Sequence, residues 1–583
     1  MNSIASRDSH HIFCTIVCMK TEATIMKKIP YGLADYKRVK EENFYFIDKT
    51  NFIEKLENLN ESYLLFLRPR RFGKSLFIAI LEAYYDKHYK NDFEMMFGDT
   101  YIGKNRTSLA SSYHIMRFDF SGIDVNDVEE SFKTYLLEKL YLFIEKYNLG
   151  IESISNPIIL FDKVFNHLQK NNLELMILID EYDNFANKLL LREKNHYLNL
   201  VNDKTASFKQ FFTVLKTATS GNDSPLKRMF ITGVTPMTMY DVTSGFNIGS
   251  NISLNHNLND MIGLNEDELE EILEYYKIDV DKEILKEWYN NYTFSEETTQ
   301  KVFNTDMILY FINKYQLTNK LPKEMIDINV RSDYSKLRNI IYTDKKLNGN
   351  FETLQTLIAG DTVSISNLVQ DFSALNLEKT NNFKSLMFYL GLVTIHSREL
   401  DLNLKIPNET VKRIDIDFLK DTLELEKVFK LNSDKIEEYL KGFALNGDID
   451  IFKYLALMIK ENTGIRDYIY KEQSVKSMYI AYLSLSPYYI IKSELELNKG
   501  FVDILIKPFN PYVKYVGLLE FKYINRDEKA NKKTIEKLKL DAIEQLKRYE
   551  NDTLVTKHTK EGLEVKKVAL IFHGWEMLVC EEV

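Results

Sequence analysis

Two groups of residues in this 583-residue chain have the types and the spacing that phosphate chemistry requires. The first is the segment Arg68-Pro-Arg-Arg-Phe-Gly-Lys-Ser75, which fits the pattern GxxxxGK[ST] except that Arg68 stands in place of the first glycine. In such a loop, backbone N–H groups and a helix N-terminus hold phosphates. Lys74 would reach the β- and γ-phosphates, and the Ser75 hydroxyl would ligate Mg²⁺.

The other residues of this loop are also candidates for nucleotide binding. Gly73 precedes the lysine, and a glycine there lets the backbone approach a phosphate closely. Arg71 is expected in the same nucleotide site. For Arg68, Arg70 and Arg71 two readings stay open: contact with phosphate or nucleotide, or an exposed basic loop that pairs with acidic neighbours.

Acidic residues follow an apolar run, LMILID, about a hundred residues downstream. Asp180 at the end of this run could hold Mg²⁺ through its water shell, and Glu181 could polarise the attacking water. A DE pair alone fits a solvated loop, but beside the phosphate loop it favours an ATPase. In the later run FITGVTP, either Thr232 or Thr235 could sense the γ-phosphate; the alternative is a threonine satisfied in the turn before Pro236.

Alternating strands and helices are needed to position these residues. The run before the phosphate loop predicts a short apolar strand, and Leu76, Ile80 and Leu81 after it have helical spacing. Strands separated by helical segments predict a parallel sheet with helices on both faces, which is an α/β fold. The expected strands are 63–67, 113–120, 173–179 and 228–234, with a helix at 207–219.

The second group lies near the C-terminus, in the runs FVDILI and YVGLLEFK. Side chains alternate along a strand, so Glu520 and Lys522 share one face with Phe521 opposite. A hairpin between the two runs can bring Asp503 beside Glu520 as a site for a hard divalent cation, where Lys522 could orient or activate water for attack on a phosphodiester. Glu494, on the preceding strand-like run, is a further candidate metal ligand. An isolated ExK on a strand is more often a solvated edge.

Changes of pattern divide the rest of the chain. Segments rich in Leu, Ile, Glu and Lys after about residue 260, such as 265–277 and 383–395, predict a helical region to which we assign no chemistry. Strands return at 488–497, 501–509, 515–524 and 566–574, with a Lys-rich helical stretch before the last. Between residues 522 and 539, seven basic residues accompany three acidic ones, which suits either a phosphate-facing patch or a solvated helix.

Composition limits the class of protein. Apolar residues make up 45% and charged residues 28% of the chain, which is typical of an ordered globular protein of several domains. The net charge of −9 argues against a uniformly basic protein that coats nucleic acid. Three cysteines, Cys14, Cys18 and Cys580, favour an intracellular, cytoplasmic location. The apolar run 12–17 is too short for a membrane span; it is either a weak signal segment or lies before a true start at Met19 or Met26.

Several of these motifs together resemble the AAA-ATPase-like family. The segments PYGLADYKRVKEENFYFIDKTNFI, LLFLRPRRFGKSLF, ILIDEYDNF and FITGVTP carry the resemblance, and arginine in place of the first loop glycine is that family's own variant. The resemblance continues through GLNEDELEEIL and EWYNNYTF, where Trp288 and Tyr292 look like family landmarks without an assigned role. Core packing is the simpler interpretation of both aromatic residues.

The C-terminal motifs, in the order SE…GxxD…ExK, resemble the PD-(D/E)XK nuclease domain that commonly follows this ATPase. Gln545 and Tyr549 are similar to its QxxxY helix, whose members pack beside the metal site; ordinary helix surface is the alternative. Family members often have GRxD, whereas Phe501 and Val502 stand between Gly500 and the aspartate here. This departure puts contact with DNA at that point in doubt without removing the metal site.

The sequence therefore predicts an N-terminal extension (1–28), an AAA-ATPase-like P-loop domain (29–260), a helical region (261–440) and an α/β, restriction-endonuclease-like PD-(D/E)XK domain (441–583). The expected function is ATP binding and hydrolysis, with ATP and Mg²⁺ as cofactors, joined to a Mg²⁺-dependent nuclease that acts on nucleic acid, DNA rather than RNA, without a membrane. The alternative is a nucleotide-dependent switch or interaction protein that binds nucleic acid or a partner without cleavage. An inert remnant of a mobile element has little support, since the candidate catalytic carboxylates are intact.

Overall fold

The central strands of the first sheet are short, largely apolar and largely buried on both faces, as parallel strands covered by helices must be. The computed structural model describes residues 26–583 except 193, 220–222, 244–248, 332–349, 378, 423–432, 462–471, 485, 487, 498–499, 510–511 and 550–551. The run 12–17, Cys14 and Cys18 lie outside the described residues. Five parallel strands are ordered β2-β3-β4-β1-β5, namely β1 (Tyr63–Leu67), β2 (His114–Asp119), β3 (Leu175–Asp180), β4 (Leu226–Gly233) and β5 (Ser250–Asn251). The parallel α/β prediction is confirmed.

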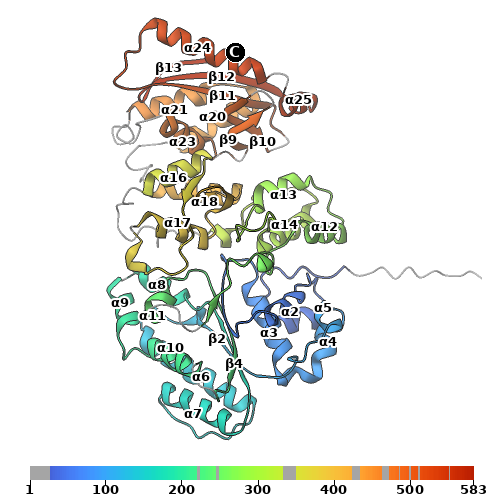
Figure 1. Ribbon diagram of the computed structural model, residues 1–583. Coiled ribbons are helices and arrows are strands. Elements are labelled where there is room, and N and C mark those ends of the chain that lie inside the picture. Colours follow the sequence, from blue (N-terminus) through green and yellow to red (C-terminus); the bar gives the residue numbers. More distant parts are fainter. Residues whose placement is uncertain are drawn as a thin grey trace, which may run out of the picture.

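Helices lie on both sides of this sheet (Figure 1). One group contains α2 (Asn51–Glu57), α3 (Lys74–Tyr85), α4 (Phe93–Phe97) and α5 (Tyr101–Lys104), and the other contains α6 (Val128–Lys146), α7 (Pro157–Lys170) and α10 (Ser207–Ala218). Helix α7 shows why these segments are helical. Asn156 caps its N-terminus, Pro157 occupies the first turn, and the buried Leu160, Phe161, Val164 and Leu168 recur at helical spacing.

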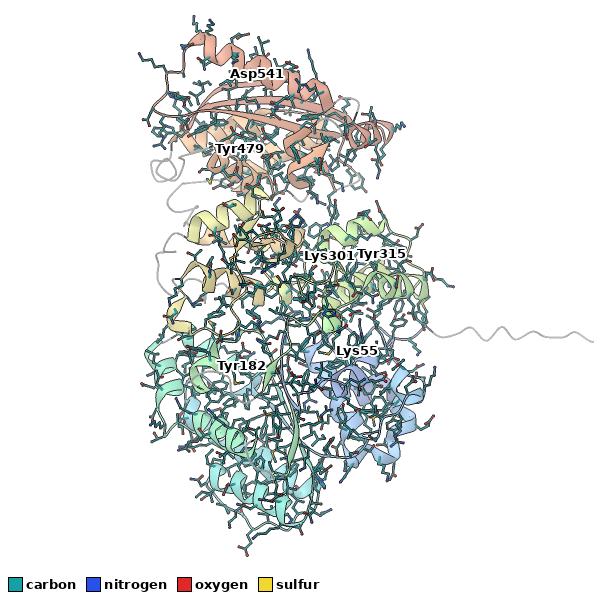
Figure 2. All side chains as sticks on the ribbon, viewed as in Figure 1. Lys55, Tyr182, Lys301, Tyr315, Tyr479 and Asp541 are labelled. Carbon is teal, nitrogen blue, oxygen red and sulfur yellow. The ribbon has the colours of Figure 1, made fainter. Side chains whose placement is uncertain are left out.

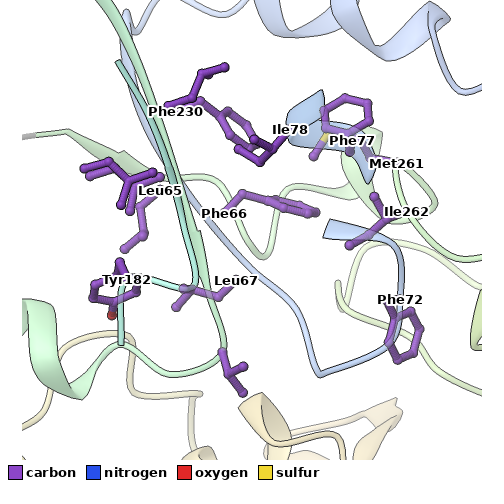
Figure 3. Close-up of a cluster of buried hydrophobic side chains, with 14 of the residues drawn as sticks. Leu65, Phe66, Leu67, Phe72, Phe77, Ile78, Tyr182, Phe230, Met261 and Ile262 are labelled. Atoms are coloured by element: carbon purple, nitrogen blue, oxygen red, sulfur yellow. The ribbon is translucent and has the colours of Figure 1, made fainter. Parts of the chain in front are cut away.

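Aromatic and aliphatic side chains fill the core beside the phosphate loop (Figure 3). Phe66 on β1 and Phe77 on α3 both contact Phe230 on β4, with ring centroids 6.2 Å apart in each pair. Such packing fixes the angle between β1 and α3. The loop that joins them, 68–73, is therefore held at both ends.

The region after the first sheet packs directly against this loop. Phe72 makes edge-on contacts with Tyr292 and Phe294, with ring centroids 4.9 and 5.4 Å apart. Tyr292 and Trp288 are fully or nearly fully buried, as core packing predicts. Residues of the middle region thus shape the phosphate loop from outside the first domain.

Helices dominate this middle region. They are α12 (Glu266–Tyr275), α13 (Lys282–Tyr289), α14 (Thr305–Thr318), α16 (Asn350–Ala359), α17 (Thr380–Tyr389) and α18 (Glu409–Thr422). A small antiparallel sheet accompanies them, in the order β6-β8-β7, from β6 (Val363–Ile365), β7 (Thr394–Arg398) and β8 (Leu402–Lys405).

The helix expected at 383–395 is only partly correct. Helix α17 ends at Tyr389, and Gly391 has a φ of 77°, a left-handed conformation that ends helices and that glycine adopts without strain. The apolar run continues past this glycine into β7, so hydrophobicity alone did not reveal the change from helix to strand.

The C-terminal domain has a mixed five-stranded sheet in the order β13-β12-β11-β10-β9. Its strands are β9 (Tyr489–Leu497), β10 (Gly500–Pro508), β11 (Tyr515–Ile524), β12 (Glu564–His573) and β13 (Glu576–Glu582), and β11 and β12 run parallel. The expected strands are present, and β13 is an addition that the sequence analysis missed. Helix α24 (Lys532–Arg548) covers one face, whereas α20 (Ser433–Asn446), α21 (Asp450–Glu461) and α23 (Glu472–Leu483) cover the other (Figure 1). Figure 2 shows Tyr479 inside this domain and Asp541 on the outer helix.

The expected start of the C-terminal domain at residue 441 falls within α20. Leu440 and Phe443, on either side of it, are buried in the same core as Leu519 and Phe521 of β11. We propose that the C-terminal domain includes all of α20, because a helix that packs as one unit is a poor place for a boundary.

Candidate nucleotide and carboxylate sites

The phosphate loop turns directly into the first turn of α3. Gly73 is the N-cap with a φ of 105°, and Arg71 has a φ of 69°. Among the described residues no side chain caps this helix. Its first N–H groups can therefore donate to an anion, which a helix N-terminus favours. The local geometry can receive a phosphate.

Lys74 is buried and lies between the loop and the end of β3. Its ammonium donates hydrogen bonds to the carbonyl oxygens of Arg68 and Pro69, at 3.1 and 2.9 Å, and lies 4.0 Å from Glu181 Oε1. Burial lowers the pKa of Lys74, while the nearby carboxylates of Glu181 and Asp180 act to raise it. The ammonium thus lies among carbonyl and carboxylate oxygens of the protein, beside the position where the loop could receive a phosphate.

Asp180 ends β3 with its carboxylate fully buried. Within the described part of the chain, the Ser75 hydroxyl is near this carboxylate, but neither oxygen has a hydrogen bond of good geometry. Burial raises its pKa to about 6, and the Ser75 hydroxyl and Lys74 partly offset this effect. A buried carboxylate without a partner is costly, and a cation beside Ser75 would satisfy it.

Glu181 is held in an unusual conformation next to Asp180. Its φ is 52°, and Asn184 donates a hydrogen bond of 2.7 Å to its Oε2. Burial acts to raise its pKa, but Lys74 and the Asn184 hydrogen bond outweigh burial and lower it. The side chain is therefore an oriented carboxylate, as a group that polarises water must be.

The two threonines of the FITGVTP run differ in their hydrogen bonds. Thr235 donates through both N–H and hydroxyl to Asp183 Oδ2, at 2.8 and 2.9 Å, so the turn already satisfies it. Thr232 is buried on β4, and its hydroxyl has no partner among the described residues. Of the two, Thr232 keeps a hydroxyl available to a ligand.

Asp183 itself was missed by the sequence analysis. It is fully buried and also accepts a hydrogen bond from Val234 N–H at 3.1 Å. A Cβ at Gly233 would lie 2.5 Å from Asp183 Oδ1, so only glycine allows this close approach. Asp183 ties the loop after β3 to the loop after β4, and the DEYD motif was the available signal.

The buried position of Arg68 contradicts both sequence-based interpretations of this residue. It contacts no open phosphate site and is not exposed: only 1% of its surface is accessible. Its guanidinium lies between the rings of Phe66 and Phe294, 4.3 and 4.1 Å from their centroids, and donates to the carbonyl oxygens of Leu67, Ser253 and Leu258. Burial lowers its pKa to about 9, so it stays charged at neutral pH. The arginine is a structural support beneath the loop.

Arg71 pairs with an acidic neighbour, as one interpretation predicted. Its Nη1 lies 2.8 Å from Asp306 Oδ2 at the start of α14. A cavity of about 300 Å³ adjoins this pair and the phosphate loop. Its walls include Tyr45 and Phe46 from the N-terminal segment and Met261 and Ile262 from the segment after the first sheet. Its mixture of apolar walls and a few polar groups is typical of a small-molecule site. Tyr45 and Phe46 lie in a segment that carries the family resemblance, but the sequence assigned them no role, and Met261 and Ile262 lie in no motif.

Strand pairing brings the C-terminal carboxylates together. The register pairs Val502 with Leu495 and Ile504 with Ser493, and Ile504 with Leu519. Asp503 on β10 is therefore opposite both Glu494 on β9 and Glu520 on β11. Asp503 Oδ2 accepts a hydrogen bond of 2.6 Å from Phe521 N–H.

Glu520 is 2% exposed and keeps one oxygen without a partner among the described residues. Its other oxygen accepts a hydrogen bond of 2.9 Å from Lys522, whose ammonium also donates to Gln545 on α24. Burial, and then the neighbouring Asp503, raise the pKa of Glu520 to about 7. Lys522 and Gln545 thus meet at the carboxylates, and Tyr549 reaches the same edge by donating to Phe501 O at 2.6 Å.

Lys476 on α23 is a central residue of this site that the sequence analysis missed. Its ammonium lies 2.5 Å from Asp503 Oδ1, 3.0 Å from Glu494 Oε1 and 2.8 Å from Glu472 Oε1. Burial acts to lower its pKa, but Asp503 leads the charges that outweigh burial and raise it. Its position on a helix, 18 and 27 residues before two of its partners, gave no local motif.

Comparison with protein families matches residues 30–243 to "Predicted AAA-ATPase" of the AAA-ATPase-like type and residues 470–582 to the PD-(D/E)XK nuclease superfamily. The chain combines an AAA-ATPase-like domain with a PD-(D/E)XK nuclease superfamily domain. The chain is also similar to an uncharacterized protein in the vnfD 5′ region of Azotobacter chroococcum mcd 1, with 22% identity over 328 residues. That match covers 55% of this chain and 60% of the relative's length, less than two thirds of it.

Nucleotide and divalent-metal use are implied by these two families, and the residues present fit both. In the AAA-ATPase-like domain, the buried carboxylate of Asp180 interacts with the Ser75 hydroxyl and with the charge of Lys74. In the nuclease-superfamily domain, Glu520 lies beside Asp503 and keeps a buried oxygen to which no residue of the described ranges donates. Among the described residues no three His, Cys, Asp or Glu side chains are grouped as a ready metal site, and Lys476 lies among the C-terminal carboxylates.

The basic segment 522–539 has mixed surroundings. Lys522 lies in the carboxylate site, whereas Lys539 pairs with Glu581 at 2.7 Å. In the part of the chain that the structure describes, no helix is long and apolar enough to cross a membrane.

Proposed function

We propose that this protein binds and hydrolyses ATP at the phosphate loop and that its C-terminal domain is a Mg²⁺-dependent nuclease that acts on nucleic acid, DNA rather than RNA. One observation carries the proposal: each domain keeps a deeply buried carboxylate, on Asp180 and on Glu520, with an oxygen to which no described residue donates a hydrogen bond, beside a lysine. Unpaired buried carboxylates are costly unless a cation completes them.

In the ATPase site, Ser75 and Asp180 would hold Mg²⁺, which would neutralise charge on the phosphates. Lys74 and the N–H groups of the first turn of α3 would bind the phosphates, and the cavity beside Tyr45 would take the base and sugar. Glu181, oriented by Asn184, would polarise the attacking water.

In the nuclease site, Asp503 and Glu520, with Glu494 beside them, would hold Mg²⁺, which would polarise the scissile phosphate. Lys522 would orient the attacking water from the same strand face. Gln545 would fix the Lys522 ammonium through their hydrogen bond, and Tyr549 would fix the β10 backbone at Phe501.

Nucleotide binding would control the nuclease through the middle region. Near the phosphate loop, Asp306 pairs with Arg71. On the other side, Glu287 of α13 pairs with Lys492 and Lys507 of the nuclease-superfamily domain, at 3.3 and 2.8 Å.

A second contact supports the same coupling. Lys412 of α18 donates a hydrogen bond of 2.7 Å to Ile491 O on β9, and Thr410 of the same helix donates to Trp288 O at 2.7 Å. The nuclease-superfamily domain thus contacts α13 and α18, and the segment after α13 carries Tyr292 and Phe294, which pack against Phe72 of the loop.

The alternative is a nucleotide-dependent switch that binds nucleic acid or a partner without cleaving it. Phe501, at the position where nuclease relatives often have arginine, is 55% exposed. An exposed aromatic ring suits stacking on a base or contact with a partner better than contact with phosphate.

The test compares the wild type with Glu181→Gln and Asp503→Ala. Each would be incubated with plasmid, single-stranded DNA and RNA, with Mg²⁺ or Mn²⁺, with and without ATP, while phosphate release is measured. Loss of phosphate release in Glu181→Gln and loss of cleavage in Asp503→Ala would support both activities. Phosphate release without cleavage of any substrate would reject the nuclease and favour the switch.

A further inference from the structure

The ammonium of Lys476 is bound as completely as an ammonium can be. It has three N–H donors, and three carboxylates, from Glu472, Glu494 and Asp503, lie within 3.0 Å of it. Its side chain is 8% exposed. Lys476 therefore occupies a position where one cation contacts three carboxylates.

This arrangement conflicts with the use of Asp503 as a metal ligand. One Asp503 oxygen accepts from Lys476 and the other accepts from Phe521 N–H. The N–H group is held by the backbone, because Phe521 lies within β11 and pairs there with Leu570 of β12. Of the two donors, the Lys476 side chain is the one that can move.

The net charge of the side chains in this cluster indicates which kind of ion could bind there. The cluster contains four carboxylates and two ammonium groups, from Glu472, Glu494, Asp503, Glu520, Lys476 and Lys522. With every group ionised the sum is −2, which a divalent ion would balance. If Lys476 left the centre, the metal would meet a stronger negative potential there.

We propose that Lys476 is an internal cation that closes the nuclease site, and that a divalent metal must displace it from Asp503 before the site is competent. This inference rests on the proposed function, because it assumes that Asp503 is a metal ligand. It adds a regulatory state: in the absence of metal, the lysine neutralises and orders the carboxylates and keeps the site inactive.

Glu472 can remain paired with Lys476 after the ammonium has left Asp503. It lies one helical turn before Lys476 on α23, and its side chain is 40% exposed. A change of side-chain rotamer can therefore keep the Lys476–Glu472 pair while the ammonium leaves Asp503. Loss of Glu472 should then make displacement harder and metal binding weaker.

Binding of Mn²⁺ to the full-length, nucleotide-free protein tests this proposal, with free Mn²⁺ followed by electron paramagnetic resonance. Lys476→Met removes the ammonium and keeps most of the stem. We expect it to bind Mn²⁺ at least about tenfold more tightly than the wild type, since a unit charge at this range is strongly felt in a partly buried site. Glu472→Gln should bind more weakly than the wild type. Lys539→Met makes the same change of net charge outside the cluster and should bind as the wild type does.

Thermal unfolding gives an independent readout. With a chelator present, Lys476→Met should unfold at a lower temperature than the wild type, because its carboxylates repel one another, and Mn²⁺ should raise its unfolding temperature by more. A lysine with only a structural role would give a variant with weaker, not tighter, binding.

The outcomes separate this inference from the proposed function. If Asp503→Ala abolishes Mn²⁺ binding but Lys476→Met binds no more tightly than the wild type, displacement of the lysine is wrong and the metal site stands. If neither the wild type nor Lys476→Met shows binding that depends on Asp503, the metal-dependent function itself fails.

Discussion

Replacing Arg68 by glycine would restore the GxxxxGK[ST] pattern and should nevertheless damage the protein. By pattern alone, Arg68→Gly should loosen the loop and improve nucleotide binding. In the structure, the guanidinium makes three hydrogen bonds to carbonyl oxygens and lies between two aromatic rings. The substitution removes all of these contacts from beneath the loop.

The magnitude follows from what the substitution leaves behind. Three carbonyl groups lose their donor, and each buried acceptor left unsatisfied costs about 1–3 kcal/mol. Removing the buried charge offsets part of the loss, whereas the cavity and the added freedom of glycine increase it. We expect a net loss of about 3–5 kcal/mol, or roughly 6–20 °C in the first thermal transition of a domain of this size.

Calorimetry and binding of a fluorescent ATP analogue would measure both effects. Arg68→Met, which fills part of the space without donors, should be destabilised, and Arg68→Lys should fall between the wild type and Arg68→Gly, since lysine keeps the charge but not the planar fork. If Arg68→Gly is as stable as the wild type and binds the analogue more tightly, the structural role assigned to Arg68 is wrong.

Three further predictions concern packing and the contacts between domains. Burial lowers the pKa of Lys412 to about 8, so the folded protein binds fewer protons than the unfolded chain between pH 8 and 10.5. The free energy of unfolding should therefore rise by up to about 3 kcal/mol across that pH range. Unfolding of Lys412→Met, measured over the same pH range, should lack this rise. Gly233→Ala should cost at least about 1–3 kcal/mol in denaturant titrations because its Cβ would clash with Asp183, whereas Gly122→Ala, with open space around its Cβ, should cost much less. Glu287→Gln should loosen the nuclease-superfamily domain from α13 and speed proteolysis between them; unchanged proteolysis would show that this ion-pair cluster does not hold the interface.

The sequence predicted those parts of both sites that depend on local order. The phosphate loop is a strand, a turn and a helix in succession, and hydrophobic runs mark all three. Glu520 and Lys522 share a face because side chains alternate in a strand, and the antiparallel pairing of β10 with β11 then brings Asp503 opposite Glu520. Each step needs only neighbouring residues or adjacent strands.

Contacts between distant segments were not predictable in this way. Arg68 is buried by Phe294 and by the carbonyl groups of Ser253 and Leu258, more than 180 residues away. A charged residue in a basic loop gives no sign of such surroundings, so both sequence-based interpretations of Arg68 failed. Lys476 is similar: its role depends on how α23 packs against β9 and β10, which no local pattern encodes.

Both sites hold a lysine on acceptors of the protein itself, and this has a consequence for ligand binding. Lys74 donates to two carbonyl groups of its own loop, and Lys476 contacts three carboxylates. A ligand that takes either ammonium, or displaces it, must offset the loss of those hydrogen bonds. Binding free energy is then used in part for rearrangement, so each site should bind its ligand less tightly than its charge suggests. Lys74 lies on α3 and Lys476 lies on α23. Because each lysine must change partners when a ligand binds, we expect these two helices to respond to whether their sites are filled.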